Sequence, residues 1–178
     1  MARPITSAAQ FAEELASYVY LNALGKREVR SLAKSIQYPI GLLNPTNKSR
    51  LRGQLAFLDA FIGTLALGEC LGECAQLSST QIQDIAADYR KRLLTRCIPE
   101  EMLPEYETRR RVWCEFFAEP IELDATMRLA SSFYELLTRR KCPEVHGCVL
   151  ALRFNQYIDL FRISVQRLAQ DLRLPGDP

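Results

Sequence analysis

Six cysteines and a single histidine are the least ordinary side chains in this sequence of 178 residues. Cys70 and Cys74 lie one helical turn apart, and two thiolates at that spacing can share a soft metal such as Cu(I) or Zn(II). Cys142, His146 and Cys148 form a second group. Structural zinc sites usually pair their cysteines two to four residues apart, in two sets. The looser pattern here leaves metal binding as an alternative to reduced thiols within a core.

Arg140 precedes His146 across a proline. An imidazole can take the proton of a 2′-hydroxyl while a guanidinium stabilises the charged phosphate. The spacing resembles that of the HEPN family of all-α nucleotide-binding and ribonuclease domains, which carry an arginine, four to six residues and then a histidine. The resemblance covers only this segment, and Lys141 stands where the family usually has a polar residue. It implies RNA cleavage by Arg140 and His146; the alternative is a histidine hydrogen-bonded locally.

Three groups of cationic side chains would form a phosphate-binding face if the fold brought them to one side. They are Arg90, Lys91, Arg92 and Arg96; Arg109, Arg110 and Arg111; and Arg139, Arg140 and Lys141. Aromatic residues do not alternate with these cations in a stacking pattern, and acidic residues lie close by in sequence. A solvated surface with internal salt bridges is therefore the alternative to nucleic-acid binding.

Composition excludes several classes of enzyme. One histidine cannot supply the two Glu-x-x-His elements of a four-helix di-iron site, nor the His-Glu-x-x-His motif of zinc hydrolases. The sequence has no glycine-rich phosphate loop, no nucleophile motif and no convincing pair of catalytic carboxylates. Catalysis needs convergent polar groups of matched pKa. We therefore expect no cofactor, and a binding role is favoured over catalysis.

Apolar residues recur at helical spacing through most of the chain, and no segment alternates with the period of a strand. We predict an all-α fold, a single-domain bundle of six to seven helices over residues 1–178, with flexible ends at 1–6 and 174–178. The expected helices cover about 7–24, 26–36, 45–76, 78–96, 105–118, 121–140 and 143–172.

The helix expected from residue 45 should be central, because small residues recur there at every fourth position. They are Ala56, Ala60, Thr64, Gly68 and Gly72. Such a strip lets another backbone approach closely, and the long amphipathic C-terminal helix should complete the core. A membrane span is not expected, because a charge such as Asp59 at the centre of a span costs about 2.5–3.5 kcal/mol.

No secretory signal precedes the cysteines, so we predict reduced thiols and a cytoplasmic location. The net charge of +2 is too small to indicate a polyanionic partner by itself. The predicted function is a non-enzymatic protein–protein interaction or assembly module. It would dock a partner protein, or a second copy of itself, through an uncovered apolar or arginine-bearing helix face. An RNA-binding or RNA-cleaving domain and a thiol metal-binding bundle are the alternatives.

Overall fold

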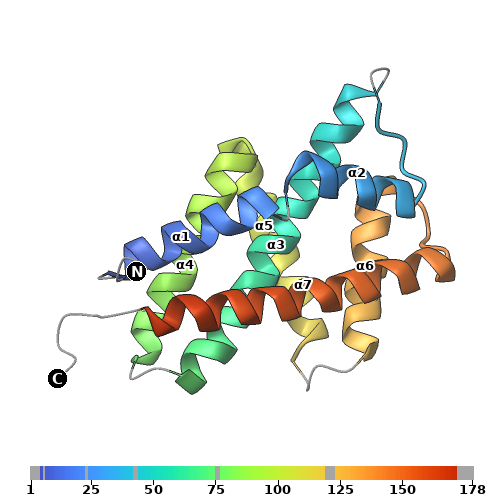
Figure 1. Cartoon of the computed structure of the whole chain (residues 1–178). Coiled ribbons are helices and arrows are strands. Elements are labelled where there is room, and N and C mark those ends of the chain that lie inside the picture. The colour runs from blue at the N-terminus through green and yellow to red at the C-terminus, as the bar shows by residue number, and fades with distance from the viewer. Residues whose placement is uncertain are drawn as a thin grey trace.

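The computed structural model describes residues 5, 7–22, 24–41, 44–74, 77–118 and 123–171, without the side chains of Asn22, Cys74, Leu123 and Asp124. Within these ranges it contains seven α-helices and one 3-10 turn (Figure 1). They are α1 (Ala8–Asn22), α2 (Lys26–Ser35), α3 (Pro45–Cys74), α4 (Ser79–Cys97), η1 (Glu100–Met102), α5 (Leu103–Phe116), α6 (Leu123–Thr138) and α7 (Glu144–Gln170). The described ranges contain no strand, only an isolated bridge at Ile5. The predicted all-α class is confirmed.

Local capping explains where several helices begin and end. At α4, the Ser78 side chain accepts from the Gln81 backbone N–H and the Gln81 side chain accepts from the Ser78 N–H, which forms a capping box. At α1, Ser7 accepts from the Gln10 N–H at 3.1 Å, and the Gln10 side chain donates to Glu14. Gly25, which directly follows the first expected helix at 7–24, is the N-cap of α2.

Helix α3 forms the centre of the fold and packs mainly against α4 and α7 (Figure 1). In its middle, residues 53–63 are buried without exception. Aromatic rings of α5 cover one side of it: Phe57 lies 5.6 Å from Tyr106 and Phe61 lies 5.4 Å from Trp113, centroid to centroid. Phe133 of α6 and Phe154 of α7 join edge to face at 5.4 Å. The core therefore joins every long helix through α3 or α7.

The strip of small residues on α3 is only partly used for packing. Ala56 and Ala60 are fully buried, whereas Gly68 and Gly72 face open space. The closest approach occurs instead at Gly63, where an added Cβ would lie 2.4 Å from the hydroxyl oxygen of Tyr89. The Tyr89 hydroxyl donates to the backbone carbonyl of Asp59 at 2.9 Å. Gly63 thus fixes how α4 lies on α3.

Helix α3 is also the one described helix that is long and apolar enough to cross a membrane. Of its most apolar 18-residue window, 72% is buried inside the protein. Its apolar surface is therefore already covered by the other helices, as in the core helix of a soluble protein.

The two ends of the described chain are joined. The Ile5 backbone N–H donates to the carbonyl of Asp171 at 2.9 Å, and the Ile5 side chain is buried. Ile5 falls in the segment predicted to be flexible, and burial of an isoleucine side chain is worth about 1.5–3 kcal/mol. Residues 1–4 and 6, and the predicted flexible end at 174–178, lie outside the described residues.

Alanine substitution should have opposite effects at two glycines of α3. Gly63→Ala forces the Tyr89 ring to move, and we expect a loss of about 1–3 kcal/mol in the free energy of unfolding. Gly68→Ala meets no neighbour and should gain up to about 1 kcal/mol from helix propensity. Urea denaturation of both variants checks the pair. Equal effects at the two positions would contradict the packing of Tyr89 on Gly63.

Asp59 places a carboxyl group inside this apolar core. Its side chain is fully buried and neither carboxyl oxygen has a hydrogen-bond partner among the described residues. Burial, and secondarily the nearby charge of Glu28, hold the pKa of Asp59 well above its usual range. Burial therefore favours the neutral form of this carboxyl group, and ionising it in the folded protein costs stability.

Stability should fall with rising pH because of Asp59. Because the pKa of Asp59 is raised in the folded state, its protonation contributes to the free energy of unfolding. This contribution is complete below the unfolded pKa of about 4 and is lost as the pH rises toward the folded pKa. We expect the wild type to lose up to about 1.4 kcal/mol per pH unit over this window relative to Asp59→Asn. Denaturation at pH 5 and pH 8 measures this, with the exposed Asp84→Asn as control. Parallel pH profiles for wild type and Asp59→Asn would contradict the assignment.

Candidate anion-binding groove

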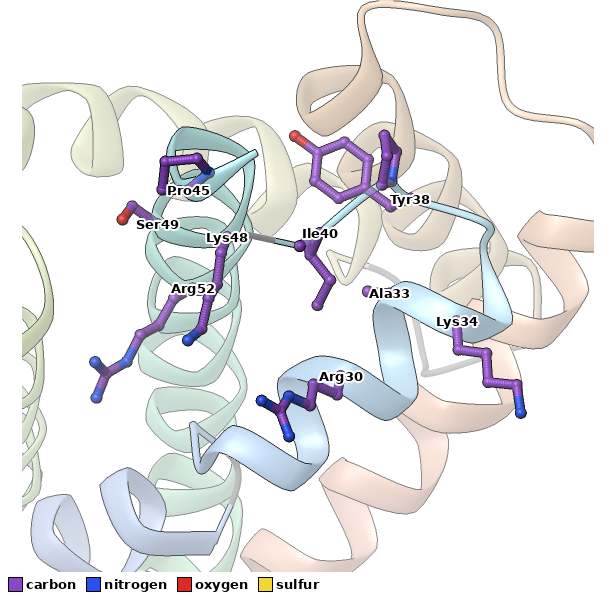
Figure 2. Close-up of a pocket in the computed structure, with 11 residues that line it drawn as sticks. Arg30, Ala33, Lys34, Tyr38, Ile40, Pro45, Lys48, Ser49 and Arg52 are labelled. Atoms are coloured by element: carbon purple, nitrogen blue, oxygen red, sulfur yellow. The ribbon is translucent and has the colours of Figure 1, made fainter. Parts of the chain in front are cut away.

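A groove of about 800 Å³ lies between α2 and the first turns of α3 (Figure 2). Its lining residues come from α2, from the connection and from α3: Arg30, Ala33, Lys34, Tyr38, Pro39, Ile40, Gly41, Pro45, Lys48, Ser49 and Arg52. Four of them carry positive charge and none is acidic. The groove is therefore lined by charge of one sign, which favours anions.

The cations reach the groove from two helices. Figure 2 shows Arg30 of α2 pointing toward α3 and Lys48 lying along α3, whereas Arg52 extends from α3 away from α2 and Lys34 points outward from the far side of α2. The inner face of α2 buries Val29 and Leu32 against the core, which leaves Arg30 and Lys34 on its flank. The packing of α2 beside α3 therefore brings cations of both helices to the lining of one groove.

These cations destabilise the helices that carry them. Arg30 and Lys34 are four residues apart on α2, and Lys48 and Arg52 are four apart on α3; each such like-charge pair costs about 0.2–0.5 kcal/mol. None of the four forms a salt bridge with a described residue. The repulsion is therefore not relieved within the described part of the molecule.

The start of α3 adds to the positive potential. Its first turn contains no acidic residue, and Lys48 and Arg52 stand in its first two turns. Cations near a helix N-terminus oppose the helix dipole, at a cost of about 0.3–1 kcal/mol each. The same N-terminus attracts anions. A bound anion would relieve both the dipole conflict and the repulsion between side chains.

Arg52 is the most firmly positioned of the groove cations. Its guanidinium lies over the ring of Tyr20 of α1, 5.1 Å from the centroid, in a cation–π contact. Its Nε is buried and has no hydrogen-bond partner among the described residues. The contact with Tyr20 therefore fixes the position of this guanidinium.

Four of the arginines singled out in the sequence are paired with acidic residues outside the groove. Glu13 of α1 binds both Arg92, at 2.8 Å, and Arg96, and these hydrogen bonds lower its pKa. Arg109 binds Glu105 and Gln54, and Arg110 binds Glu107 at 2.9 Å. Arg90 is half-buried, and Arg111 and Arg139 are exposed. None of these seven arginines lines the groove. For Arg92, Arg96, Arg109 and Arg110, the structure agrees with the salt-bridged surface that was the alternative to nucleic-acid binding.

The structure separates Arg140 from His146. Arg140 lines a smaller hollow beside the end of α6, and His146 is not among the lining residues. The His146 ring instead packs 5.3 Å from the Tyr134 ring, and its Nδ1 is buried without a hydrogen-bond partner among the described residues. The two side chains therefore share no described cleft in which a phosphate could reach both.

The cysteines do not gather in the described part of the chain. Cys70 is buried, with its Sγ 3.9 Å from the carbonyl oxygen of Arg162. Cys142 is half-buried and Cys148 is exposed. Among the described residues no group of three or more His, Cys, Asp and Glu side chains is placed to hold a metal ion. The side chain of Cys74 lies outside the description.

The groove residues were not singled out from the sequence, yet a signal for them exists. Arg30–Lys34 and Lys48–Arg52 are two like-charge pairs at helical spacing, on either side of a proline-containing connection. Neither pair has an acidic residue one turn away. Pairs that repel without compensation mark a surface that something else must neutralise.

Comparison of the chain with protein-family models, curated proteins and solved structures finds no match.

Proposed function

We propose that this protein is a non-enzymatic helical binding module whose α2–α3 groove takes a phosphate-bearing partner. The observation that carries the proposal is a groove whose lining contains Arg30, Lys34, Lys48 and Arg52 and no acidic residue. Guanidinium groups bind phosphate oxygens in a bidentate way, and a lysine adds a compact charge. The groove supplies charge and shape without a general base or a nucleophile, so binding is its chemistry.

The proposed module works in the cytoplasm. Cys97, Cys114, Cys142 and Cys148 are free thiols, which suits a reducing compartment. Burial raises the pKa of the Cys97 thiol to about 11, so little of it is present as the reactive thiolate.

Lys48→Gln tests the groove, because it should change stability and binding in opposite directions. Removing the charge relieves the dipole conflict, so we expect a gain of about 0.3–1 kcal/mol in the free energy of unfolding. The same change should weaken binding of inorganic tripolyphosphate at least fivefold, measured by calorimetry at 50 mM salt. Wild-type affinity should fall as salt rises.

The control for this experiment is Lys91→Gln, an exposed cation of α4 that lies outside the groove. It should leave tripolyphosphate affinity within twofold of the wild type. Tripolyphosphate binding that is equal in wild type and Lys48→Gln, or that is absent from the wild type, would overturn the proposed function.

A second candidate function, self-assembly, is supported by one face of α7. Val145, Leu152, Leu160 and Ile163 are exposed by 71%, 63%, 52% and 45% and fall on one side of the helix. Leu150, Phe154 and Phe161 of the same helix are buried in the core. A stripe along a single helix can pair with its own copy about a twofold axis.

If α7 mediates assembly, the mass of the protein should rise with concentration in light scattering. Leu160→Glu should return it to the monomer, because a carboxylate on the stripe would be buried without a partner. Val112→Glu, at an equally apolar exposed position of α5, should leave the mass unchanged. A wild type that stays monomeric up to about 1 mM would contradict self-assembly through α7, since even a weak dimer has a Kd of this order.

A further inference from the structure

A second basic hollow of about 290 Å³ adjoins the α2–α3 groove. It is lined by Ile36, Gln37, Tyr38, Pro39, Asn47, Arg50, Tyr134, Leu137, Thr138 and Arg140. Tyr38 and Pro39 line both spaces, so they form the ridge between them. The hollow contains Arg50 and Arg140 and no acidic residue. Groove, ridge and hollow therefore make one path with positive charge on both sides of an aromatic ring.

The ridge is held in place by hydrogen bonds on both of its residues. The Tyr38 backbone N–H donates to the carbonyl of Ala33 at 2.8 Å, and Asn47 Nδ2 donates to the carbonyl of Pro39 at 2.9 Å. Gln37, just before Tyr38, adopts the left-handed φ of 53° that turns the chain out of α2. The Tyr38 ring is half-buried and thus remains accessible on one side.

The cations of the second hollow are anchored from α3 and α6. Arg50 donates to the carbonyl of Leu136 at 2.9 Å, which fixes its guanidinium at the C-terminal end of α6. Arg50 lines the same hollow as Tyr38. Burial raises the pKa of Tyr38, while the charge of Arg50 acts on it in the opposite direction. Arg140 is exposed and forms no salt bridge with a described residue.

We infer that the phosphate-bearing partner is a single strand of nucleic acid, which crosses from the α2–α3 groove over Tyr38 to Arg50 and Arg140. This inference rests on the proposed function of the groove. Single-strand sites combine a basic channel that follows the backbone with an aromatic ring on which a base stacks. A lone phosphate would use the groove only and leave the second hollow empty.

The shape of the path favours a single strand over an anionic membrane. Membrane-surface binding uses cations on a protruding or flat face together with exposed apolar anchors. Here the cations line two concave spaces, and the aromatic side chain between them is half-buried. A polymer with phosphates along its length and flat bases between them matches this alternation of charge and ring.

The test compares octauridylate with tripolyphosphate on the full chain. Wild type should bind octauridylate at least tenfold more tightly than tripolyphosphate. Tyr38→Leu should weaken octauridylate binding about 5- to 100-fold, and Tyr38→Phe should retain it, since stacking needs only the ring. Arg140→Gln should lower the slope of log affinity against log salt by about 0.7. Arg140→Gln should not change the affinity for tripolyphosphate.

Arg111→Gln, an exposed cation of α5 outside both spaces, is the matched control and should behave as wild type. Because Arg140 is exposed, its variant keeps the test valid even where Tyr38→Leu perturbs folding. This inference is overturned if octauridylate binds no more tightly than tripolyphosphate, or if Arg140→Gln leaves octauridylate binding unchanged. Either result leaves the proposed function of the groove in place. Tighter binding to vesicles of anionic phospholipid, lost in Arg140→Gln, would assign the path to a membrane instead. Failure of tripolyphosphate to bind overturns the proposed function itself.

Discussion

The enclosure of α3 by the other helices is the constraint on which the rest of the structure depends. Residues 53–63 are buried all round, so every neighbouring helix must present apolar surface to this one rod. Gly63 admits the Tyr89 ring and thereby sets the line of α4. The first turns of α3 project beyond this enclosed region, and it is there that Lys48 and Arg52 line the groove beside α2. The groove is thus made by the part of the central helix that the core does not cover.

Helix periodicity and capping residues predicted much of this fold, because they act within a few residues of chain. The capping box of Ser78 and Gln81 sets the start of α4 without help from any tertiary contact. The strip of small residues that ends in Gly68 and Gly72 was a poor guide to helix packing. Such a strip shows that a close approach is sterically allowed, but it does not show that a partner helix lies there. The approach occurs at Gly63, and its partner Tyr89 lies on another helix, which no local pattern reveals.

The site was predicted less well, for an electrostatic reason. Clusters consecutive in sequence, such as Arg109 and Arg110, attract notice, but helical geometry turns neighbours to different faces and gives each its own acidic partner. The groove cations are dispersed in pairs, and they meet only because α2 folds back beside α3. Repulsion between like charges one turn apart in a helix indicated the groove better than the local density of charge along the sequence did.

The hydrogen bond between Ile5 and Asp171 has a consequence for how the chain is made. These residues are separated by almost the whole sequence, and α7 supplies Leu150, Phe154 and Val165 to the core. During synthesis, the helices that emerge first have no α7 to cover their apolar surface. The core can therefore be completed only after α7 has left the ribosome. A chain shortened before α7 would expose the apolar surface of α3 and be a substrate for chaperones and proteases.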